Sequence, residues 1–389
     1  MTRSLLERTI DMARAGRTPA TGEPVPTGRR HPDGYLQYLA GDGYAYASEP
    51  GGEIYLGADS LQFAAFVQQL RLRGRALDLG SGSGLLAARL ARSCTHVTAI
   101  DNSAAAVGAS RATLAAECAP DRFEVVHTDL FAYLRETCPV DAVVTNLPFV
   151  PVPDGLSYSG YGAGGPTGLG LVERVLAELP AVLRAEAVFC LKVHCAVGPQ
   201  GPLVAEPIRR FLERTGHAGC LMIDGDVPMA FRAAQSARNA VPFNPGHDDL
   251  LGVFDRHYSH LGEEFVSTIV VTQSASGSLR PGELITVDRR PAPAATAPAE
   301  AVPLPLVLRR YGALTAQMPE GYEELGTAAM VDEVAAHAER ILELAAAGAG
   351  LEQCVREGLP GVAGLDPVAV RGYLVPVDRL RRAAQREAV

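Results

Sequence analysis

Three carboxylates and one carboxamide are placed where short, strand-like apolar runs end. Asp78 lies within "RALDL", Asp101 ends "HVTAID", Asp129 closely follows "FEVVH", and Asn146 follows "DAVVT". In an open α/β sheet, ligands bind outside the carboxyl ends of the parallel strands, where the residues that follow these strands meet. The four side chains are therefore expected to outline one binding crevice.

The segment "ALDLGSGSGLLA" predicts a strand, a tight turn and a helix. Its turn contains Gly80, Ser81, Gly82 and Gly84, and glycine lets the backbone turn sharply and approach a ligand. A turn without a ligand is the alternative interpretation. Asp101 lies about 20 residues after the first glycine, where a carboxylate can reach both hydroxyls of a ribose. A dinucleotide shares this geometry but normally requires GxGxxG, so the GxGxG spacing here favours a nucleoside without phosphates.

Asp129 and Asn146 each allow a specific prediction. Asp129 could accept a hydrogen bond from an adenine amino group, or it could cap a helix that begins at Leu130. Asn146 begins "NLPF", in which a side-chain amide and the Leu147 carbonyl precede the rigid Pro148. This arrangement presents polar groups at the end of a strand and predicts that something is held there.

Strand-like and helix-like segments alternate between residues 53 and 288, which is typical of βαβ units and a parallel sheet. At least six strands are expected, which gives a doubly wound α/β domain. Residues 1–52 are interpreted as an N-terminal helical or cap segment. The Ala/Pro-rich residues 289–305 are interpreted as a linker, and helical periodicity beyond it predicts a small helical domain over residues 306–389.

Composition limits the classes of partner. The 389 residues are 47% hydrophobic and carry a net charge of −9, so the chain can bury a large core but lacks the basic footprint of a nucleic-acid-binding protein. The seven cysteines form no CxxC pair, and no metal is expected, although a site built from His247, His257 and His260 is an alternative. No apolar run of about 18 residues and no signal peptide are seen, which predicts a cytoplasmic protein without membrane contact.

Taken together, residues 76–194 resemble a class I S-adenosylmethionine-dependent methyltransferase. The resemblance implies a Rossmann-like methyltransferase sheet with S-adenosyl-L-methionine as cofactor, and a glycine turn beneath the methionine moiety. It places Asp78 near the methionine amino group, Asp101 at the ribose and Asp129 at the adenine. The implied cofactor-binding residues are Asp78, Gly80, Ser81, Gly82, Gly84, Asp101, Asn102, Asp129, Leu130 and Asn146.

The "NLPF" segment resembles the [ND]-x-P-[FY] motif of amino-methyltransferases. The resemblance implies that Asn146 Oδ1 and the Leu147 carbonyl accept the hydrogens of a planar nitrogen, while Phe149 stacks on the substrate. The implied catalytic residues are Asn146, Leu147, Pro148 and Phe149. Two further segments, "GAGGPTGLGLVERVLAELPAVLR" and "IYLGADSLQFAAFV", are similar to those of release-factor glutamine methyltransferases and related small-domain enzymes.

The sequence also departs from that branch. Leu147 replaces the first proline of NPPY, as in the NLPY of ribosomal adenine dimethylases, but those enzymes usually have a basic C-terminal domain and this chain is acidic. The release-factor enzymes lack a C-terminal extension of this size. These departures favour a small methyl acceptor. Residues 196–262 form a long polar insert, interpreted either as a lid that recognises a carboxylate and a cation or as a solvated connection.

The predicted function is N-methylation of a guanidino or amide nitrogen of a small molecule, such as a free amino acid, in specialised metabolism. The alternatives are methylation of a protein glutamine or of an RNA adenine or guanine. A non-catalytic, cofactor-binding assembly module is a further alternative, against which the intact "NLPF" motif argues. The expected partner is a small-molecule methyl acceptor, and the weakly amphipathic C-terminal helices also suit a homodimer.

Overall fold

The computed structural model describes residues 3–16, 23–49, 52–262, 264–290 and 328–362, together with Tyr373, Val377, Leu380 and Arg381. The chain forms two compact units, Met1–Arg290 and Pro291–Val389, which are considered separately. Most of the predicted linker 289–305, and the start of the predicted domain 306–389, lie outside the described residues.

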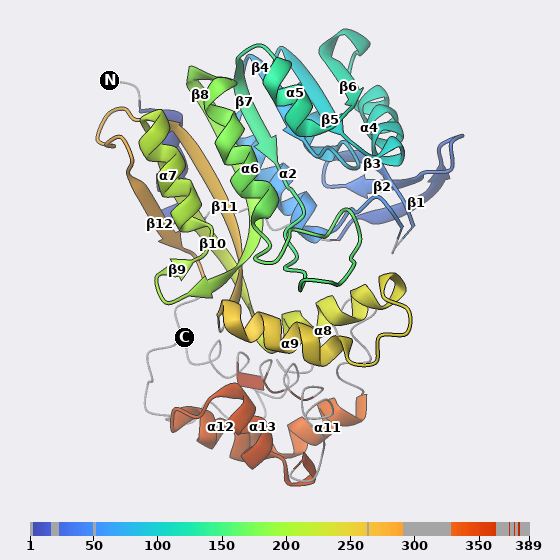
Figure 1. The fold of residues 1–389 in the computed structure, drawn as a ribbon, viewed down its shortest axis with the longest axis vertical. Coiled ribbons are helices and arrows are strands. Elements are labelled where there is room, and N and C mark those ends of the chain that lie inside the picture. The colour runs from blue at the N-terminus through green and yellow to red at the C-terminus, as the bar shows by residue number, and fades with distance from the viewer. Residues whose placement is uncertain are drawn as a thin grey trace. The chain divides into compact units, whose positions relative to one another are not determined.

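The larger unit is built on a nine-stranded sheet with the order β12-β10-β11-β8-β7-β4-β5-β6, and β9 pairs with β8 outside this path (Figure 1). The strands are β4 (Arg75–Leu79), β5 (His96–Asp101), β6 (Phe123–His127), β7 (Val140–Thr145), β8 (Leu183–Gly198), β9 (Gly201–Pro202), β10 (His217–Pro228), β11 (Glu264–Ser274) and β12 (Leu284–Asp288). Strands β8, β7, β4, β5 and β6 pair in parallel, whereas β11 is antiparallel to β8 and β10. The predicted Rossmann-like α/β fold class is confirmed.

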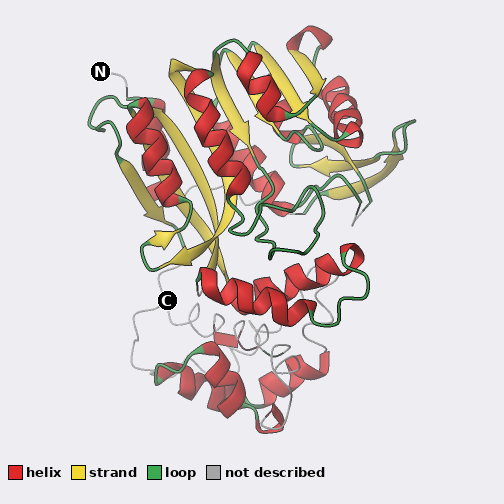
Figure 2. Ribbon diagram, in the orientation of Figure 1, coloured by secondary structure: helices red, strands yellow, loops and turns green. Residues whose placement is uncertain are grey.

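Helices cover both faces of this sheet (Figure 2). They are α1 (Leu5–Arg14), α2 (Ala58–Leu70), α3 (Leu85–Ala91), α4 (Ala104–Glu117), α5 (Leu130–Glu136), α6 (Gly170–Glu178) and α7 (Ala205–Thr215). Successive strand residues point to opposite faces, so Ala76 packs in the cluster with α1 to α4 while Leu77 and Leu79 pack in the cluster with α5 to α7. The strand ends are thereby held between two buried layers.

The N-terminal segment is only partly helical. The helix α1 begins with a capping box formed by Ser4 and Glu7. The residues that follow form a small antiparallel sheet of β1 (Val25–Arg30), β2 (Leu36–Ala40) and β3 (Gly43–Ala47), which the interpretation of residues 1–52 as a helical or cap segment did not include. Tyrosines alternate with smaller residues in β3, as is typical of β-structure. Tyr38 of β2 is buried against Ala109 of α4.

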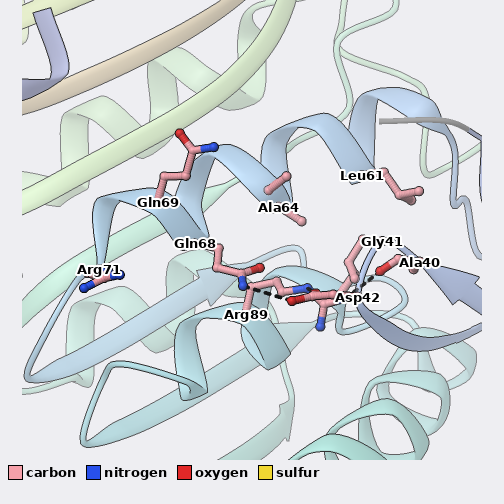
Figure 3. A pocket seen from close by; sticks show the side chains of 11 residues that line it. Ala40, Gly41, Asp42, Leu61, Ala64, Gln68, Gln69, Arg71 and Arg89 are labelled. Carbon is pink, nitrogen blue, oxygen red and sulfur yellow. Dashed lines mark hydrogen bonds and ion pairs between the residues drawn. The ribbon is translucent and has the colours of Figure 1, made fainter. Parts of the chain in front are cut away.

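A hollow of about 400 Å³ lies where this small sheet meets α2 and α3 (Figure 3). The Arg89 guanidinium of α3 donates a hydrogen bond of 2.6 Å to the Ala40 carbonyl of β2. It also forms ion pairs with Asp42 at 3.6 Å and Glu117 at 3.5 Å. These contacts tie the N-terminal sheet to α3 and α4.

The structure divides the predicted insert 196–262 into two parts. The chain up to Pro228 belongs to the sheet, as the crossover helix α7 and strand β10, and only the part that follows leaves it. That part is a helical hairpin of α8 (Met229–Ala240) and α9 (Leu250–Leu261), joined through a 3₁₀ turn at Val241–Phe243. The sequence analysis did not predict strand β10, because its apolar run is short and is followed by Asp224 and Asp226.

The described part of the smaller unit is helical. It contains α11 (Ala328–Ala336), α12 (Ala338–Ala346) and α13 (Leu351–Gly358), which bury Val334, Ile341 and Val355. None of the helices in the described ranges of the chain is both long and apolar enough to cross a bilayer.

Candidate active site

A cavity of about 800 Å³ lies where β4, β5, β6 and β7 end. Its wall includes most of the predicted site residues, namely Gly80, Ser81, Gly82, Asp101, Asn102, Asp129, Leu130, Asn146, Leu147 and Pro148. Asp78, Gly84 and Phe149 do not line it. The structure therefore brings together residues that are spread over almost 70 positions of the sequence, as the common edge of a parallel sheet requires.

The glycines of the turn after β4 serve different purposes. Gly82 has a φ of +51°, and a side chain there would meet nothing within 4 Å. Gly84 has a φ of +74°, but a Cβ atom there would lie 2.8 Å from Ser110 Cα in α4. Gly84 is thus required for the packing of α3 against α4, whereas Gly82 leaves open space at the cavity.

Asp101 is anchored by the backbone around it. Its Oδ2 accepts a hydrogen bond of 2.9 Å from the Gly82 amide, and its Oδ1 accepts one of 2.9 Å from the Ser103 amide. An ionised carboxylate can accept about four hydrogen bonds, so each oxygen keeps capacity for a ligand. The carboxylate is therefore held in place with capacity to accept hydrogen bonds from ribose hydroxyls.

The position of Asp129 is compatible with both interpretations from the sequence, a helix cap and a hydrogen-bond acceptor for an adenine amino group. It is the N-cap of α5, because Oδ1 accepts hydrogen bonds from the amides of Phe131 at 3.1 Å and Ala132 at 2.9 Å. The cap uses Oδ1 alone, and the residue also lines the cavity. The cap fixes the side chain and leaves Oδ2 for a donor such as an amino group.

Asp78 lies beneath the glycine turn and is fully buried. Its Oδ2 accepts a hydrogen bond of 2.9 Å from the Ala87 amide of α3, while Oδ1 has no partner among the described residues. Burial raises the pKa of this carboxyl to about 7, and the nearby Asp101 charge adds to the rise.

The "NLPF" segment presents an acceptor without a partner. Asn146 Oδ1 is buried at the cavity and receives no hydrogen bond from the described residues. Leu147 is buried against Gly80, where a Cβ atom would lie 3.2 Å from its Cδ2, so the leucine fits the space that the glycine turn leaves. The end of β7 is fixed by Thr145, whose hydroxyl donates a 2.7 Å hydrogen bond to the Leu79 carbonyl of β4.

Phe149 faces strand β8 and helix α8. Its ring stacks on the imidazole of His194, with centroids 4.5 Å apart and planes at 13°. The Arg232 guanidinium of α8 lies 5.6 Å from the same ring centroid. The aromatic end of the motif thus contacts side chains that the sequence analysis did not connect with it.

Strand β8 contributes two polar residues that sequence reasoning missed. Lys192 is fully buried, and its Nζ donates to Ser267 Oγ at 2.6 Å and to Gln62 Oε1 at 3.2 Å. Burial holds the pKa of His194 well below its ordinary value, and the charges of Lys192 and Arg232 add to this effect. The signal was present in "CLKVHC", where two polar residues at alternate positions interrupt a central apolar strand.

The helical hairpin α8–α9 reaches the cavity through Phe243, which lines it. Asn244 ties the hairpin to the loop after "NLPF", because Nδ2 donates to the Ser157 carbonyl at 2.8 Å and Oδ1 accepts from the Ser157 amide at 2.9 Å. The His257 ring lies 2.6 Å from the Pro166 carbonyl. Across the described residues, no group of three or more His, Cys, Asp or Glu side chains is placed to hold a metal ion.

The cavity suits a nucleoside in its chemistry. Two anchored carboxylates with unused acceptor capacity stand at the ends of the neighbouring strands β5 and β6, and an unsatisfied amide oxygen stands at the end of β7, on the other side of β4. Buried polar atoms normally have hydrogen-bond partners, so the Asn146 oxygen indicates a ligand that supplies a donor.

One comparison with known proteins identifies a type of domain. Residues 59–154 match the family model described as the methyltransferase small domain. No curated protein sequence gave a match.

Among solved structures, a precorrin-6y C5,15-methyltransferase of Geobacter metallireducens is 16% identical, with 55% of this chain and 89% of that chain covered and a TM-score of 0.33. Trm5b of Pyrococcus abyssi is 11% identical, with coverage of 61% and 55% and a TM-score of 0.38. A structure described as a putative RNA methyltransferase of Pyrococcus horikoshii is 15% identical, with coverage of 56% and 85% and a TM-score of 0.34.

Proposed function

We propose a reaction for this chain, which is a class I S-adenosylmethionine-dependent methyltransferase with a methyltransferase small domain over residues 59–154. The enzyme methylates a planar nitrogen, of the guanidino or amide type, in a small molecule such as a free amino acid, and acts in specialised metabolism. The observation that carries this proposal is Asn146 Oδ1, a buried hydrogen-bond acceptor at the cavity with no partner among the described residues.

The cofactor side is assigned to the glycine turn and the two anchored carboxylates. The Gly80–Gly84 turn passes beneath the methionine moiety, Asp101 binds the ribose hydroxyls, and Asp129 Oδ2 accepts from the adenine amino group. Asn102 and Leu130 line the cavity beside these carboxylates. The positive charge of the methionine amino group favours the ionised form of Asp78, which is buried beneath the turn.

The acceptor side is assigned to "NLPF". S-adenosylmethionine supplies a methyl group on a positively charged sulfur. Guanidino and amide nitrogens are weak nucleophiles because their lone pairs are delocalised. Asn146 Oδ1 and the Leu147 carbonyl accept hydrogen bonds from the N–H groups of this nitrogen. These hydrogen bonds orient the nitrogen and favour the electron-rich form that is reached at the transition state. Phe149, with Pro148 before it, flanks the acceptor plane.

Two observations favour a small acceptor. The net charge of −9 does not favour the many phosphate contacts through which proteins hold nucleic acid. The hairpin α8–α9 also covers part of the cavity through Phe243 and is tied to the neighbouring loop at Asn244, which narrows the approach for a folded polymer.

The test is transfer of labelled methyl groups. The purified protein is incubated with methyl-labelled cofactor and separate pools of free amino acids and guanidino compounds, a glutamine-containing release-factor fragment, and ribosomal RNA. Label is expected in the small-molecule pool. Asn146→Ala should lower the transfer rate by about 100-fold or more because the acceptor nitrogen is no longer positioned, with cofactor binding largely retained.

A matched control is Gln69→Ala, which removes an exposed amide on α2 outside the cavity and should leave the rate unchanged. An undiminished rate in Asn146→Ala would remove the proposed acceptor site. Label only in the RNA or the polypeptide would replace the substrate class, and cofactor binding without label in any pool would favour a non-catalytic assembly module.

A further inference from the structure

Unpartnered polar groups continue beyond "NLPF" into the space between β8, β10 and α8. His194 Nε2, Arg232 Nε, Arg289 Nε and both carboxylate oxygens of Asp224 are buried without a hydrogen bond from the described residues. Leaving such groups unsatisfied costs free energy. Two of them, His194 and Arg232, contact Phe149 of "NLPF", so a ligand bound there could supply their partners.

One of these residues, Asp224, lies at a β-bulge. The register between β10 and β11 shifts between Ile223 and Gly225, and the residue at the shift is Asp224. Bulges turn a side chain away from its normal direction and are common beside active sites. Asp224 then forms an ion pair with Arg289, with Oδ1 and Nε 3.3 Å apart, so this pair satisfies its own charges.

Arg232 differs because it has no carboxylate partner among the side chains that the structure describes. Its guanidinium lies 5.6 Å from the Phe149 ring centroid and 5.1 Å from that of Phe265, and it donates one hydrogen bond to Gln235 Oε1. The aromatic contacts hold the cation without neutralising it. A partly buried arginine whose Nε has no partner among the described residues is well suited to bind a carboxylate, which a guanidinium can hold through two parallel hydrogen bonds.

The side chains around Arg232 leave its guanidinium as the cation that a bound anion would meet. His194 lies against the same Phe149 ring, and burial keeps it neutral, so it can offer a hydrogen bond without adding a charge. The amino group of Lys192, two residues before it on β8, is already held by Ser267 and Gln62. Arg232 is also within electrostatic reach of Tyr55, which lines the cavity, so its charge acts at the reaction site.

We infer that Arg232, which lies against the rings of Phe149 and Phe265, binds a carboxylate of the methyl acceptor. The acceptor then joins a planar nitrogen at Asn146 to a carboxylate at Arg232, as an amino acid with a guanidino or amide side chain does. This inference rests on the proposed function and assigns the acceptor specificity of its site to α8.

The test compares acceptors that differ only in the carboxylate. Arginine is paired with agmatine, and glutamine with 4-aminobutanamide, and KM and kcat are measured for each with labelled cofactor. The wild-type enzyme should favour the carboxylate-bearing member of a pair by about tenfold or more, since a hydrogen bond to a charged group is lost in the other. Arg232→Gln should raise KM for the carboxylate-bearing acceptor by a similar factor and leave KM for its partner unchanged.

Two variants control for folding and charge. Arg232→Lys keeps the cation against the aromatic rings but loses the planar fork, so it should give an intermediate KM. Arg256→Gln removes an arginine on α9 that is mostly exposed and pairs with Asp249 at the surface, and should behave as wild type.

The outcomes separate the two proposals. If the wild-type enzyme methylates both members of a pair equally and Asn146→Ala abolishes this, the proposed function stands and the carboxylate inference is overturned. If Arg232→Gln weakens both members equally, the inference is likewise overturned. If no small molecule is methylated, or only RNA or polypeptide is, both proposals fail.

Discussion

The two sides of the cavity satisfy their polar groups in different ways. On the cofactor side, Asp101 and Asp129 each accept two hydrogen bonds from nearby backbone amides, all within three residues of one another except for the contact to Gly82. On the acceptor side, Asn146 Oδ1, His194 Nε2 and Arg232 Nε have no partner among the described residues. One side is therefore preformed by its own backbone, whereas the other lacks the partners that a bound acceptor would supply.

The difference has a physical cause. A carboxylate next to a helix start finds free amides within its own turn, so the local chain fixes it at little cost in entropy. The proposed acceptor side is assembled from the segment after β7, from β8 and from α8, which meet at the Phe149 ring, and their polar atoms receive no hydrogen bond from the described residues. Specificity gained in this way lowers the stability of the free protein, because the unsatisfied groups are paired only in the complex.

The largest effect on stability is expected from Gly84. Comparing Gly84 with Gly82 distinguishes a glycine needed for helix packing from one that leaves space for a ligand on the proposed cofactor side. Gly84→Ala should lower the free energy of unfolding by about 3 kcal/mol, because a Cβ atom meets the Ser110 backbone and the left-handed conformation is unfavourable. Gly82→Ala should cost only about 1 kcal/mol, since no atom lies within 4 Å, and should act mainly on cofactor affinity. Urea denaturation and titration calorimetry measure the two effects, and equal losses of stability would refute the distinction.

Asp101 tests whether the cofactor side works independently of the acceptor side. Asp101→Ala should weaken S-adenosylmethionine binding by about tenfold or more, or roughly 2 kcal/mol, through loss of a charge-assisted hydrogen bond. Asp101→Asn keeps an acceptor for the Gly82 amide and should lose less. Calorimetric titration reports both values, and unchanged affinity in Asp101→Ala would remove the ribose from this position.

A pH-dependent effect on the free energy of unfolding is expected from Asp78. An unfolded carboxyl loses its proton near pH 4, whereas the folded one keeps it up to about pH 7. Between these values the folded state binds more protons than the unfolded state, so this residue's contribution makes stability fall as pH rises, by at most about 1.4 kcal/mol per pH unit. Urea denaturation from pH 4 to 8 should show a flatter profile for Asp78→Asn, and an identical slope in both proteins would contradict the raised pKa.

The cofactor side could be predicted from sequence because each of its residues follows its own strand. The glycine turn, Asp101 and Asp129 occur in the order of the βα units, so local patterns locate them and the topology of a parallel sheet brings them together. The family match to residues 59–154 covers the same part of the chain. The small antiparallel sheet of β1 to β3 was missed because Gly and Pro residues break up its short strands.

The acceptor side could not be predicted in the same way. The contact of Phe149 with His194 and Arg232 joins three elements that are remote in sequence, and it depends on the position of α8. That position follows from strand β10, which the sequence analysis placed inside the polar insert. The polar pair Lys192 and His194 was the one local signal, and it acquires a meaning only once β8 is known to be central.

The way in which the hairpin α8–α9 is attached to the sheet determines how freely its length and sequence can be changed. Strands β10 and β11 are paired up to Val227 with Phe265 and Pro228 with Glu264, and the hairpin leaves and rejoins the sheet at that last pair. Lengthening, shortening or replacing the segment between them leaves the alignment of the core strands unchanged. The segment that carries Arg232 can therefore be exchanged without shifting the strand ends that line the cavity.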